Sequence, residues 1–312
     1  MDTPPEHQTQ NRRAVIDVGS NSVKLLVADV SAGQVLPVKA KGKQTRLGKG
    51  VFETGKLQPE RIDETARVIG KFAAKASELG AGSLRVLATS AAREAANGAD
   101  FARAVAAYGL ELEIISGEKE ANLILRAVRT HPDFADGTVA VMDAGGGSTE
   151  LLVANESNLL TQASHPLGTV RWLDKFPPQD PPTEADRLAV RNSIIEFLQT
   201  AVVPQLRGIP LPSMLVASGG SPKFLTRLLE GTRDLSIEQI EKREVTVGEI
   251  RQLADKLWSL PLAARRELPG MSANRADVLL MGAAIYEAVM EQFGFQTLRP
   301  SMRGVRYGAL LD

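Results

Sequence analysis

The stretch VMDAGGGSTELLVA, residues 141–154, carries the strongest structural signal in the sequence, because a similar stretch, VIDVGSNSVKLLVA, occupies residues 15–28. When the chain is shifted by 126 positions, residues 14–28 and 140–154 are identical at nine of fifteen positions. Each copy reads as an apolar strand, an aspartate, a polar turn with glycine and a second apolar strand. A chain that repeats such a hairpin is expected to use the two copies together.

Length and composition predict a two-domain protein of the ordinary globular kind. The 312 residues suffice for two domains, and the hydrophobic and charged fractions are 43% and 24%. Lysine plus arginine and aspartate plus glutamate both number 37, so the formal net charge is zero. The overall charge therefore gives no sign of a nucleic-acid or membrane partner, and no apolar run approaches the about 20 residues of a membrane span. We expect neither partner.

The sequence contains no cysteine, which excludes disulfides, thiolate metal sites and a cysteine nucleophile. This composition is typical of the reducing cytosol, and a cytoplasmic location is expected. The three histidines stand far apart in the sequence, so neither a zinc cluster nor a Ser-His-Asp triad is predicted. The start of the chain is polar and lacks the apolar core of a signal peptide, so residues 1–12 are expected to be a disordered lead-in.

Strand and helix signals alternate along the chain, which predicts the α/β fold class. In the first half, strands are expected at 15–17, 24–30, 34–43, 84–88 and 112–115, and helices at 59–79, at 91–106 with a break at Asn97-Gly98, and from 117 to about 128. In the second half, after the hairpin, a strand is expected at 214–217 and helices at 184–206, from 222, at 237–258, at 272–293 and at the end of the chain.

The turns of the two hairpins have the composition of anion-binding loops. Glycine lets backbone N–H groups approach a phosphate closely, and the hydroxyl side chains are further donors. The predicted phosphate-binding residues are Gly19, Ser20, Asn21, Ser22, Gly145, Gly146, Gly147, Ser148 and Thr149. Asp17 and Asp143 each end the first strand of a hairpin, where a carboxylate suits Mg²⁺. The alternative interpretation is an ordinary hairpin with glycine in its turn.

Two such hairpins in one chain resemble the phosphate loops of the actin, sugar-kinase and heat-shock-chaperone superfamily. The sequence motifs indicate one branch of this superfamily, since the following phrases occur in this order: IDVGSNSVKLLVADV, ATSAAREAANG, SGEKEAN, DAGGGSTELLV and LGTVR. Together with RELPGMSANRADVLLMGAAI and SMRGVRYGALL near the end, they closely resemble the exopolyphosphatase and guanosine pentaphosphate phosphohydrolase family. The resemblance runs from about residue 13 to residue 311.

This resemblance implies two actin-like, or ribonuclease H-like, α/β lobes. Each lobe would have a mixed sheet flanked by helices, and the active-site cleft would lie between the lobes. Residues 13–125 are expected to form the first lobe and residues 126–298 the second, with residues 299–312 crossing back to the first. Gly219 and Gly220, in a strand-to-helix turn, would line the cleft, and a simple helix start is the alternative.

The resemblance also implies the functional side chains. Glu120 stands at the second acidic position of the phrase SGEKEA, residues 116–121, which is assigned in the family as the base that activates water. Arg93 follows a strand and opens a helix, where its guanidinium would hold the phosphoryl group. The predicted metal ligands are Asp143, Glu150 and Asp17.

Each of these assignments has a structural alternative. Glu120 would then only complement the N-terminus of a helix. Arg93 would be a surface arginine paired with Glu94 or Glu111. Glu150 would be a solvent-facing strand residue.

The stretch VKAKGKQTRLGKG, residues 38–50, contains no acid, and its cations are Lys39, Lys41, Lys43, Arg46 and Lys49. In a chain of zero net charge, this local cluster would guide a long polyanion toward the cleft. The alternative is a solvated edge strand that its lysines keep from pairing with other chains.

Two residues depart from the family's pattern. Lys119 stands where many members have an acid or an amide, and Tyr307 stands where the family usually has glutamate. A cation beside Glu120 would lower its basicity or add a phosphate contact. The chain also stops at residue 312, where longer relatives continue with helical domains, so strong processivity on long chains is not expected.

We therefore expect an exopolyphosphatase that uses Mg²⁺, or Mn²⁺, to hydrolyse the terminal phosphoanhydride bond of inorganic polyphosphate and release orthophosphate. Three alternatives stay open: the same chemistry on guanosine pentaphosphate, a kinase of the sugar-kinase type, and a non-catalytic sensor of polyphosphate or nucleotide. The resemblance implies a homodimer. It leaves the preferred substrate length and any need for a monovalent cation open.

Overall fold

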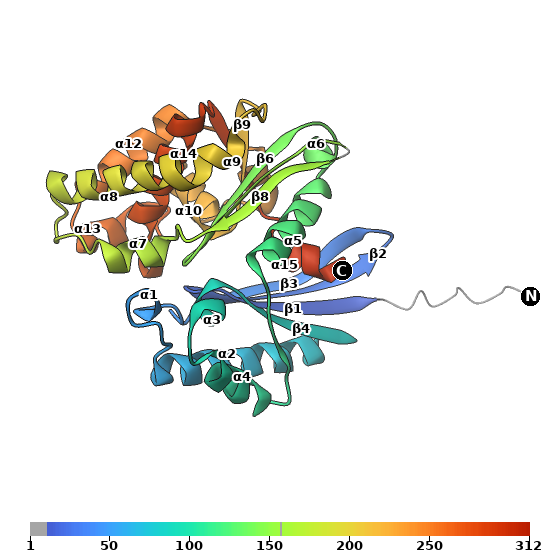
Figure 1. Cartoon of the computed structure of the whole chain (residues 1–312). Coiled ribbons are helices and arrows are strands. Elements are labelled where there is room, and N and C mark those ends of the chain that lie inside the picture. Colours follow the sequence, from blue (N-terminus) through green and yellow to red (C-terminus); the bar gives the residue numbers. More distant parts are fainter. Residues whose placement is uncertain (1–10, 157) are drawn as a thin grey trace, which may run out of the picture.

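The computed structural model describes residues 11–156 and 158–312, so all but the end of the predicted lead-in lies outside the described residues. Two sheets, each covered by helices, lie one above the other in Figure 1. The first strand, β1 (Arg12–Val18), begins one residue before the predicted start of the first lobe. The Val30 backbone N–H donates to the Asn11 carbonyl at 3.0 Å, so residues 11 and 12, which were predicted to belong to the lead-in, are part of the first sheet region.

The first sheet contains the first copy of the hairpin. β2 (Ser22–Ser31) pairs antiparallel with both β1 and β3 (Gln34–Gln44). On the other side of β1, β4 (Ser83–Ala88) and β5 (Leu112–Ile114) continue the sheet in parallel. The order β3-β2-β1-β4-β5 therefore makes a mixed sheet, as predicted.

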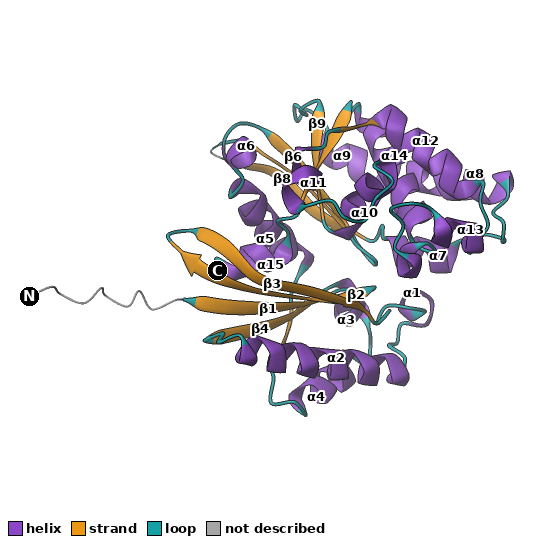
Figure 2. Ribbon diagram, turned by 180° about the vertical axis from the view of Figure 1, so that it is seen from behind, coloured by secondary structure: helices purple, strands orange, loops and turns teal. Residues whose placement is uncertain are grey.

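Helices cover the face of this sheet that points away from the second lobe (Figure 2). The helices of this region are α1 (Val51–Thr54), α2 (Pro59–Glu78), α3 (Ser90–Glu94) and α4 (Gly98–Ala106). The apolar stripe that predicts α2 is buried, with Ile62, Ala66 and Ile69 in the core. The predicted break before α4 is confirmed, and the Asn97 side chain there exchanges hydrogen bonds of 2.8 and 3.0 Å with the Leu57 backbone.

The second sheet repeats the same arrangement around the second hairpin. β6 (Val139–Ala144), β7 (Thr149–Ala154) and β8 (Leu159–His165) are antiparallel, as β1, β2 and β3 are. β9 (Met214–Ser218) lies parallel to β6, in the place that β4 takes beside β1. β11 (Thr297–Ser301) and the short β10 (Val245–Thr246) complete the order β10-β11-β9-β6-β7-β8.

The second lobe is rich in helices. They are α6 (Pro132–Ala135), α7 (Thr169–Lys175), α8 (Glu184–Phe197), a π-helical turn (Leu198–Val202), α9 (Val203–Leu206), α10 (Gly220–Leu229), α11 (Ile237–Lys242), α12 (Val247–Trp258), α13 (Leu262–Glu267), a 3₁₀ turn (Ala273–Arg275) and α14 (Leu279–Phe293). The α14 helix is buried along most of its length. Among the helices of the described residues, none combines the length and apolar character that spanning a bilayer requires.

The helix predicted at 237–258 is wrong, because the chain forms α11, β10 and α12 there. Thr246 pairs with β11 and caps α12: its hydroxyl accepts the Glu249 N–H at 3.2 Å, and the Glu249 carboxylate accepts the Thr246 N–H at 2.9 Å. The start of the helix predicted at 272–293 is also wrong, because a 3₁₀ turn precedes α14.

Two helices fill the space between the sheets on one side (Figures 1 and 2). α5 (Gly117–Arg129) packs on β7 and β8, and α15 (Val305–Leu310) packs on α5, β1 and β2. A Cβ on Gly308 of α15 would lie 2.0 Å from the Leu123 carbonyl oxygen, so glycine permits this close contact. The chain crosses back toward the first sheet only after β11, because residues 299–301 still belong to the second sheet.

Candidate active site between the two hairpins

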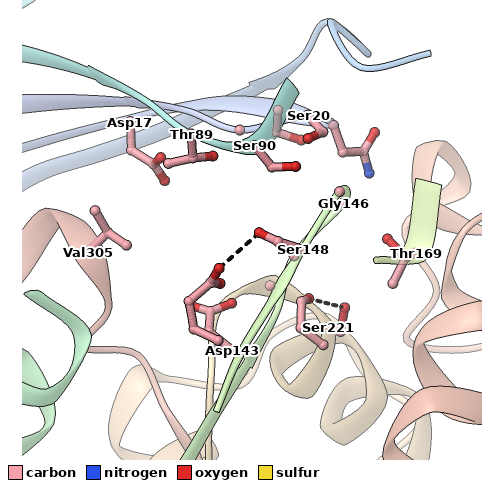
Figure 3. Close-up of a pocket in the computed structure, with 18 of the residues that line it drawn as sticks. Asp17, Ser20, Thr89, Ser90, Asp143, Gly146, Ser148, Thr169, Ser221 and Val305 are labelled. Carbon is pink, nitrogen blue, oxygen red and sulfur yellow. Dashed lines mark hydrogen bonds between the residues drawn. The ribbon is translucent and has the colours of Figure 1, made fainter. Parts of the chain in front are cut away.

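The two hairpin turns face each other across a small cavity (Figure 3). In the first turn, the Gly19 N–H donates to the Ser22 carbonyl at 3.1 Å. In the second, the Gly145 N–H donates to the Ser148 carbonyl at 2.9 Å. The repeated sequence therefore forms the same turn twice, and both turns line one cavity, so the two copies meet as predicted.

The loops approach so closely that a side chain on Gly147 would not fit. A Cβ there would lie 2.5 Å from Ser90 Oγ and 2.6 Å from Ser20 Oγ. The cavity between the loops has a volume of about 70 Å³. The predicted site residues that line it are Asp17, Gly19, Ser20, Asn21, Ser22, Glu120, Asp143, Gly145, Gly146, Gly147, Ser148, Glu150 and Gly220. Both halves of the sequence thus contribute to one site.

Three predicted site residues lie outside this cavity. The Thr149 hydroxyl donates to the Leu167 carbonyl, so its assignment as a phosphate donor does not fit the structure. Arg93 does not line the cavity and is linked to it by the hydrogen bond that it donates to the Glu120 carboxylate. Gly219 lines the larger pocket next to the cavity.

Gly219 is required by its contact with Asp143. A Cβ on Gly219 would lie 2.3 Å from Asp143 Oδ1, and its φ of +91° favours glycine. The hydroxyl of the preceding residue, Ser218, donates to Asp143 Oδ2 at 3.1 Å. The strand-to-helix turn after β9 therefore fixes the carboxylate that ends β6.

Glu120 lies in the first turn of α5 with its carboxylate buried, its exposed fraction being 7%. Ser116 caps this helix by accepting the Lys119 N–H at 3.1 Å. Arg93 Nη1 donates to Glu120 Oε2 at 3.2 Å and to the Ile115 carbonyl at 2.8 Å. The alternative pairing of Arg93 with Glu94 or Glu111 is not found, and the arginine instead orients Glu120.

Glu150 is 2% exposed, so the alternative of a solvent-facing residue is wrong. Its Oε1 accepts hydrogen bonds from Ser148 Oγ at 2.9 Å and from Ser164 Oγ at 2.7 Å. The strand register places Glu150 directly opposite Asp143, so both carboxylates lie on the same face of the sheet.

Burial raises the pKa of three carboxyl groups at the cavity. It raises the pKa of Glu150 to about 7, and the charge of Asp143 adds to this effect. It also raises the pKa of Glu120 well above its ordinary value, with the charge of Glu150 adding to the shift and Arg93 opposing it. Burial raises the pKa of Asp143 as well, against the nearby charge of Lys24. Negative charge is therefore costly at this site without a cationic partner.

A divalent cation would relieve this repulsion. In residues 11–156 and 158–312, however, no three aspartate, glutamate, histidine or cysteine side chains lie close enough to hold one ion together. Asp17, Asp143 and Glu150 therefore do not form a closed ligand group in this conformation. The oxygen donors still suit Mg²⁺, because it keeps several waters and takes its other ligands from one or two carboxylates and from substrate phosphates.

A larger pocket of about 340 Å³ adjoins the cavity and shares with it two carboxylates, Asp17 and Asp143, and two cations, Lys24 and Arg275. Lys223 and Arg306 also line this pocket, together with Lys41 and Lys43 of β3. Burial lowers the pKa of Lys223, and the charge of Arg227, followed by those of Arg306, Lys24 and Arg275, lowers it further. Burial also lowers the pKa of Arg275 to about 10. This concentration of buried positive charge indicates a site for a polyanion.

The basic stretch at 38–50 supplies little of this charge. Lys41 and Lys43 stand opposite Leu25 and Val23, whose side chains pack under α2. Residues directly opposite in an antiparallel pair share a face, so the side chains of these lysines point toward the α2 side of the sheet and away from the cleft. Both residues nevertheless belong to the lining of the pocket, because β3 runs along it. Arg46 pairs with Asp277 at 2.6 Å. The alternative, an exposed edge strand carrying lysines, is confirmed.

The two departures from the family's pattern lie outside the cavity. Lys119 forms an ion pair of 3.3 Å with Asp312. Tyr307 packs among the apolar residues between the two sheets. Its neighbour Arg306 lines the pocket and donates to the Leu25 carbonyl at 2.9 Å. Neither Lys119 nor Tyr307 therefore alters the cavity directly.

Several lining residues were not predicted from the sequence: Lys24, Thr89, Ser90, Thr169, Lys223, Arg275, Val305 and Arg306. Lys24 had a usable signal, because the repeat places it at the position that Glu150 takes in the second copy. Of the others, all but Lys223 lie within the phrases that carry the family resemblance, but nothing in those phrases singled them out.

The model of the Ppx/GppA phosphatase family matches residues 26–312. The chain belongs to the Ppx/GppA phosphatase family. It is 32% identical over 302 residues to "Exopolyphosphatase 1" of Mycobacterium leprae, which covers 96% of this chain and 88% of that protein. It is 31% identical to "Exopolyphosphatase 2" of Mycobacterium tuberculosis, with 96% of this chain and 98% of that protein covered. The predicted class, a phosphoanhydride hydrolase, agrees with this family.

Solved structures of the Ppx/GppA family have the same fold. The crystal structure of the Aquifex aeolicus family member matches with a TM-score of 0.79 at 30% identity, over 96% of each chain. An exopolyphosphatase from Cytophaga hutchinsonii matches with a TM-score of 0.87 at 24% identity, also over 96% of each chain. The predicted actin-like, two-lobed α/β fold is confirmed.

Proposed function

We propose that this chain is a Mg²⁺-dependent exopolyphosphatase, which hydrolyses the terminal phosphoanhydride bond of inorganic polyphosphate and releases orthophosphate. The observation that carries the proposal is the arrangement of two cavities. A small cavity, lined by two glycine loops, four carboxylates and the cations Lys24 and Arg275, adjoins a larger pocket where Lys223 and Arg306 add further positive charge. The terminal phosphate would occupy the first and the following phosphates the second.

In this proposal, Asp17, Asp143 and Glu150 would hold Mg²⁺ together with water and phosphate oxygens. When bound, the ion neutralises charge on the transferred phosphoryl group. The chain's own loops then orient that group through backbone N–H groups and serine hydroxyls.

Glu120 is the base in this mechanism. Its raised pKa makes the carboxylate a stronger proton acceptor than an exposed glutamate near neutral pH. It accepts a proton from the attacking water, whose oxygen forms a bond to phosphorus as the bridging oxygen leaves with the shortened chain. Arg93 orients the carboxylate through the 3.2 Å contact to Oε2.

The pocket favours polyphosphate over the other substrates considered. A sugar kinase needs a neutral hydrogen-bonding pocket for its acceptor, whereas this pocket is cationic. Guanosine pentaphosphate is a second candidate, because Phe224 offers a ring in the pocket. The Arg275 guanidinium lies 5.2 Å from the centroid of that ring, however, and competes with a stacked base. The two relatives named above are exopolyphosphatases by name.

The test is release of orthophosphate from long-chain polyphosphate and, in parallel, from guanosine pentaphosphate, each with Mg²⁺ and with a chelator. We expect Mg²⁺-dependent release that is faster from polyphosphate. Faster release from guanosine pentaphosphate would select the second candidate. Binding of polyphosphate without any release would favour the sensor alternative. The homodimer and the cytoplasmic location stay predictions.

A further inference from the structure

The first turn of α7 binds the carbonyls of the second glycine loop. The donor and acceptor pairs are Thr169 N–H and Gly145 O (3.0 Å), Val170 N–H and Gly146 O (2.8 Å), and Arg171 Nε and Gly147 O (2.7 Å). A trans peptide points its N–H opposite to its C=O. These bonds therefore turn the N–H groups of Gly146, Gly147 and Ser148 away from α7, toward the cavity that the loop lines.

Arg171 also reaches across to the first lobe. Its Nη2 donates to both carboxylate oxygens of Glu94, at 2.6 and 2.7 Å. Glu94 Oε1 in turn accepts the hydroxyl of Ser90, which lines the cavity, at 2.7 Å. The Arg171 guanidinium lies over the Phe52 ring, 3.8 Å from its centroid. One side chain thus connects both walls of the cavity.

This contact has more partners than an ordinary surface ion pair. The Arg171 side chain is 14% exposed and the Glu94 side chain 40% exposed, so water reaches the pair from the Glu94 side. Its hydrogen bonds to Glu94 are charge-assisted. Its stacking on Phe52 adds a cation–π contact.

We infer that the Arg171–Glu94 ion pair is a strap between the lobes. It sets the distance between the second glycine loop and the opposite wall of the cavity, which contains Ser90. An arginine beside a phosphate loop is commonly a direct phosphate ligand. Here its Nε is bound to Gly147, its Nη2 to Glu94 and its flat face to Phe52. Arg171 is therefore a positioning residue, which acts on the terminal phosphate through the Gly147–Ser148 peptide and the Ser90 hydroxyl. The inference rests on the proposed function for the identity of that phosphate.

The kinetic test uses Arg171→Met, Glu94→Gln and the double variant with polyphosphate as substrate. We expect kcat to fall at least tenfold in Arg171→Met, with KM changed less than threefold, because the lost orientation affects the transition state more than substrate binding. Glu94→Gln should lower kcat in the same direction. The kcat of the double variant should lie within twofold of the kcat of Arg171→Met, because the two residues act as one unit.

Arg191→Met is the matched control, since it removes an arginine–glutamate pair of 2.7 Å with Glu291 elsewhere in the second lobe. Its kcat should stay within twofold of wild type. Arg171→Lys keeps the charge but cannot bind Gly147 and Glu94 together, so partial recovery is expected. The strap is overturned by an Arg171→Met variant with wild-type kcat, by additive losses in the double variant, or by a raised KM in Arg171→Met with unchanged kcat.

A distance measurement tests the strap without any turnover. Because the chain has no cysteine, Lys71→Cys on α2 and Glu196→Cys on α8, both exposed, give one spin label in each lobe. Electron–electron resonance should show a longer or broader distance distribution in Arg171→Met than in the labelled parent. An unchanged distribution overturns the strap. If the parent released no orthophosphate from either substrate, the proposed function would fail, while this measurement would still decide the strap.

Discussion

Glu120 and Glu150 are identical side chains whose different neighbours suit the different roles proposed for them. Two serine hydroxyls bind the same oxygen of Glu150, so its position in β7 is fixed from both sides. In Glu120, Oε2 accepts a hydrogen bond from Arg93, and the residue lies in the first turn of α5. The fixed carboxylate of Glu150 therefore suits a metal ligand, and the carboxylate of Glu120 suits proton transfer.

Replacing Glu120 with glutamine should remove the proposed base while keeping the shape of the side chain. We expect kcat for orthophosphate release to fall by roughly 10²-fold or more. The matched control is Glu118→Gln, two residues earlier on the same helix and exposed, which should keep kcat within threefold. Activity of Glu120→Gln within a few-fold of wild type would show that another group activates the water.

Single residues were predicted well where the hairpin repeat marks them and poorly elsewhere. The glycine turns and the aspartates were predictable, because each copy of the hairpin confirms the other. Thr149 was assigned to phosphate because hydroxyls donate to anions, but the Leu167 carbonyl, from a loop after β8, takes its proton. Lys223 lies outside the phrases that carry the resemblance, and Arg306 lies in one of them without a pattern that assigns it to the pocket.

Among the elements, the first turn of α5 is tightly constrained by its contact with β8. A Cβ on Gly117 would lie 2.3 Å from the Cβ of Ser164 and 2.8 Å from its Oγ. Ser164 is also the donor to Glu150, so this contact fixes Glu120 on α5 relative to Glu150 on β7. The glycine of the phrase SGEKEA therefore has a packing role that the sequence did not reveal.

Gly117→Ala should force α5 away from β8. We expect a loss of about 1–3 kcal/mol of unfolding free energy from overpacking, together with a fall in kcat, because the two carboxylates separate. The matched control is Gly248→Ala in the first turn of α12, where the nearest atom to the new Cβ would be 3.9 Å away. That change should leave stability equal or slightly higher. Thermal unfolding and orthophosphate release measure both, and a Gly117→Ala variant as stable as wild type would contradict the packing argument.

Element types followed from periodicity, while some boundaries depended on tertiary contacts. The apolar stripe of α2 and the break before α4 are local signals in the sequence, and both predictions are confirmed. The interruption at β10 was not predictable, because its two residues are a strand only through pairing with β11, some fifty residues later. The cap on α12 was visible in the sequence as Thr246 and Glu249, but the surrounding helical pattern concealed it.

Across the whole molecule, the formal net charge is zero, yet charged groups of both signs concentrate where the two lobes meet. Four carboxylates and the cations Lys24 and Arg275 line the small cavity, and Lys223 and Arg306 line the pocket beside it. The fold itself followed from the repeat and the resemblance, whereas this concentration of charge arises only when the two lobes meet. The sequence analysis placed the cationic surface on 38–50 instead, because charge density along a strand does not tell which face the side chains occupy.

The position of the cations makes a prediction for long substrates. Lys223 on α10 lines the pocket, so Lys223→Gln should raise KM for long-chain polyphosphate by roughly tenfold, about 1.4 kcal/mol, with kcat within twofold. Added salt should weaken substrate binding less in this variant, because one phosphate contact is lost. Lys39→Gln is the control, since Lys39 stands opposite Val27 on the face of β3 that points away from the cleft, does not line the pocket and should leave KM unchanged. A rise in KM for Lys39→Gln equal to that for Lys223→Gln would mean that the polyanion follows the edge strand rather than the pocket.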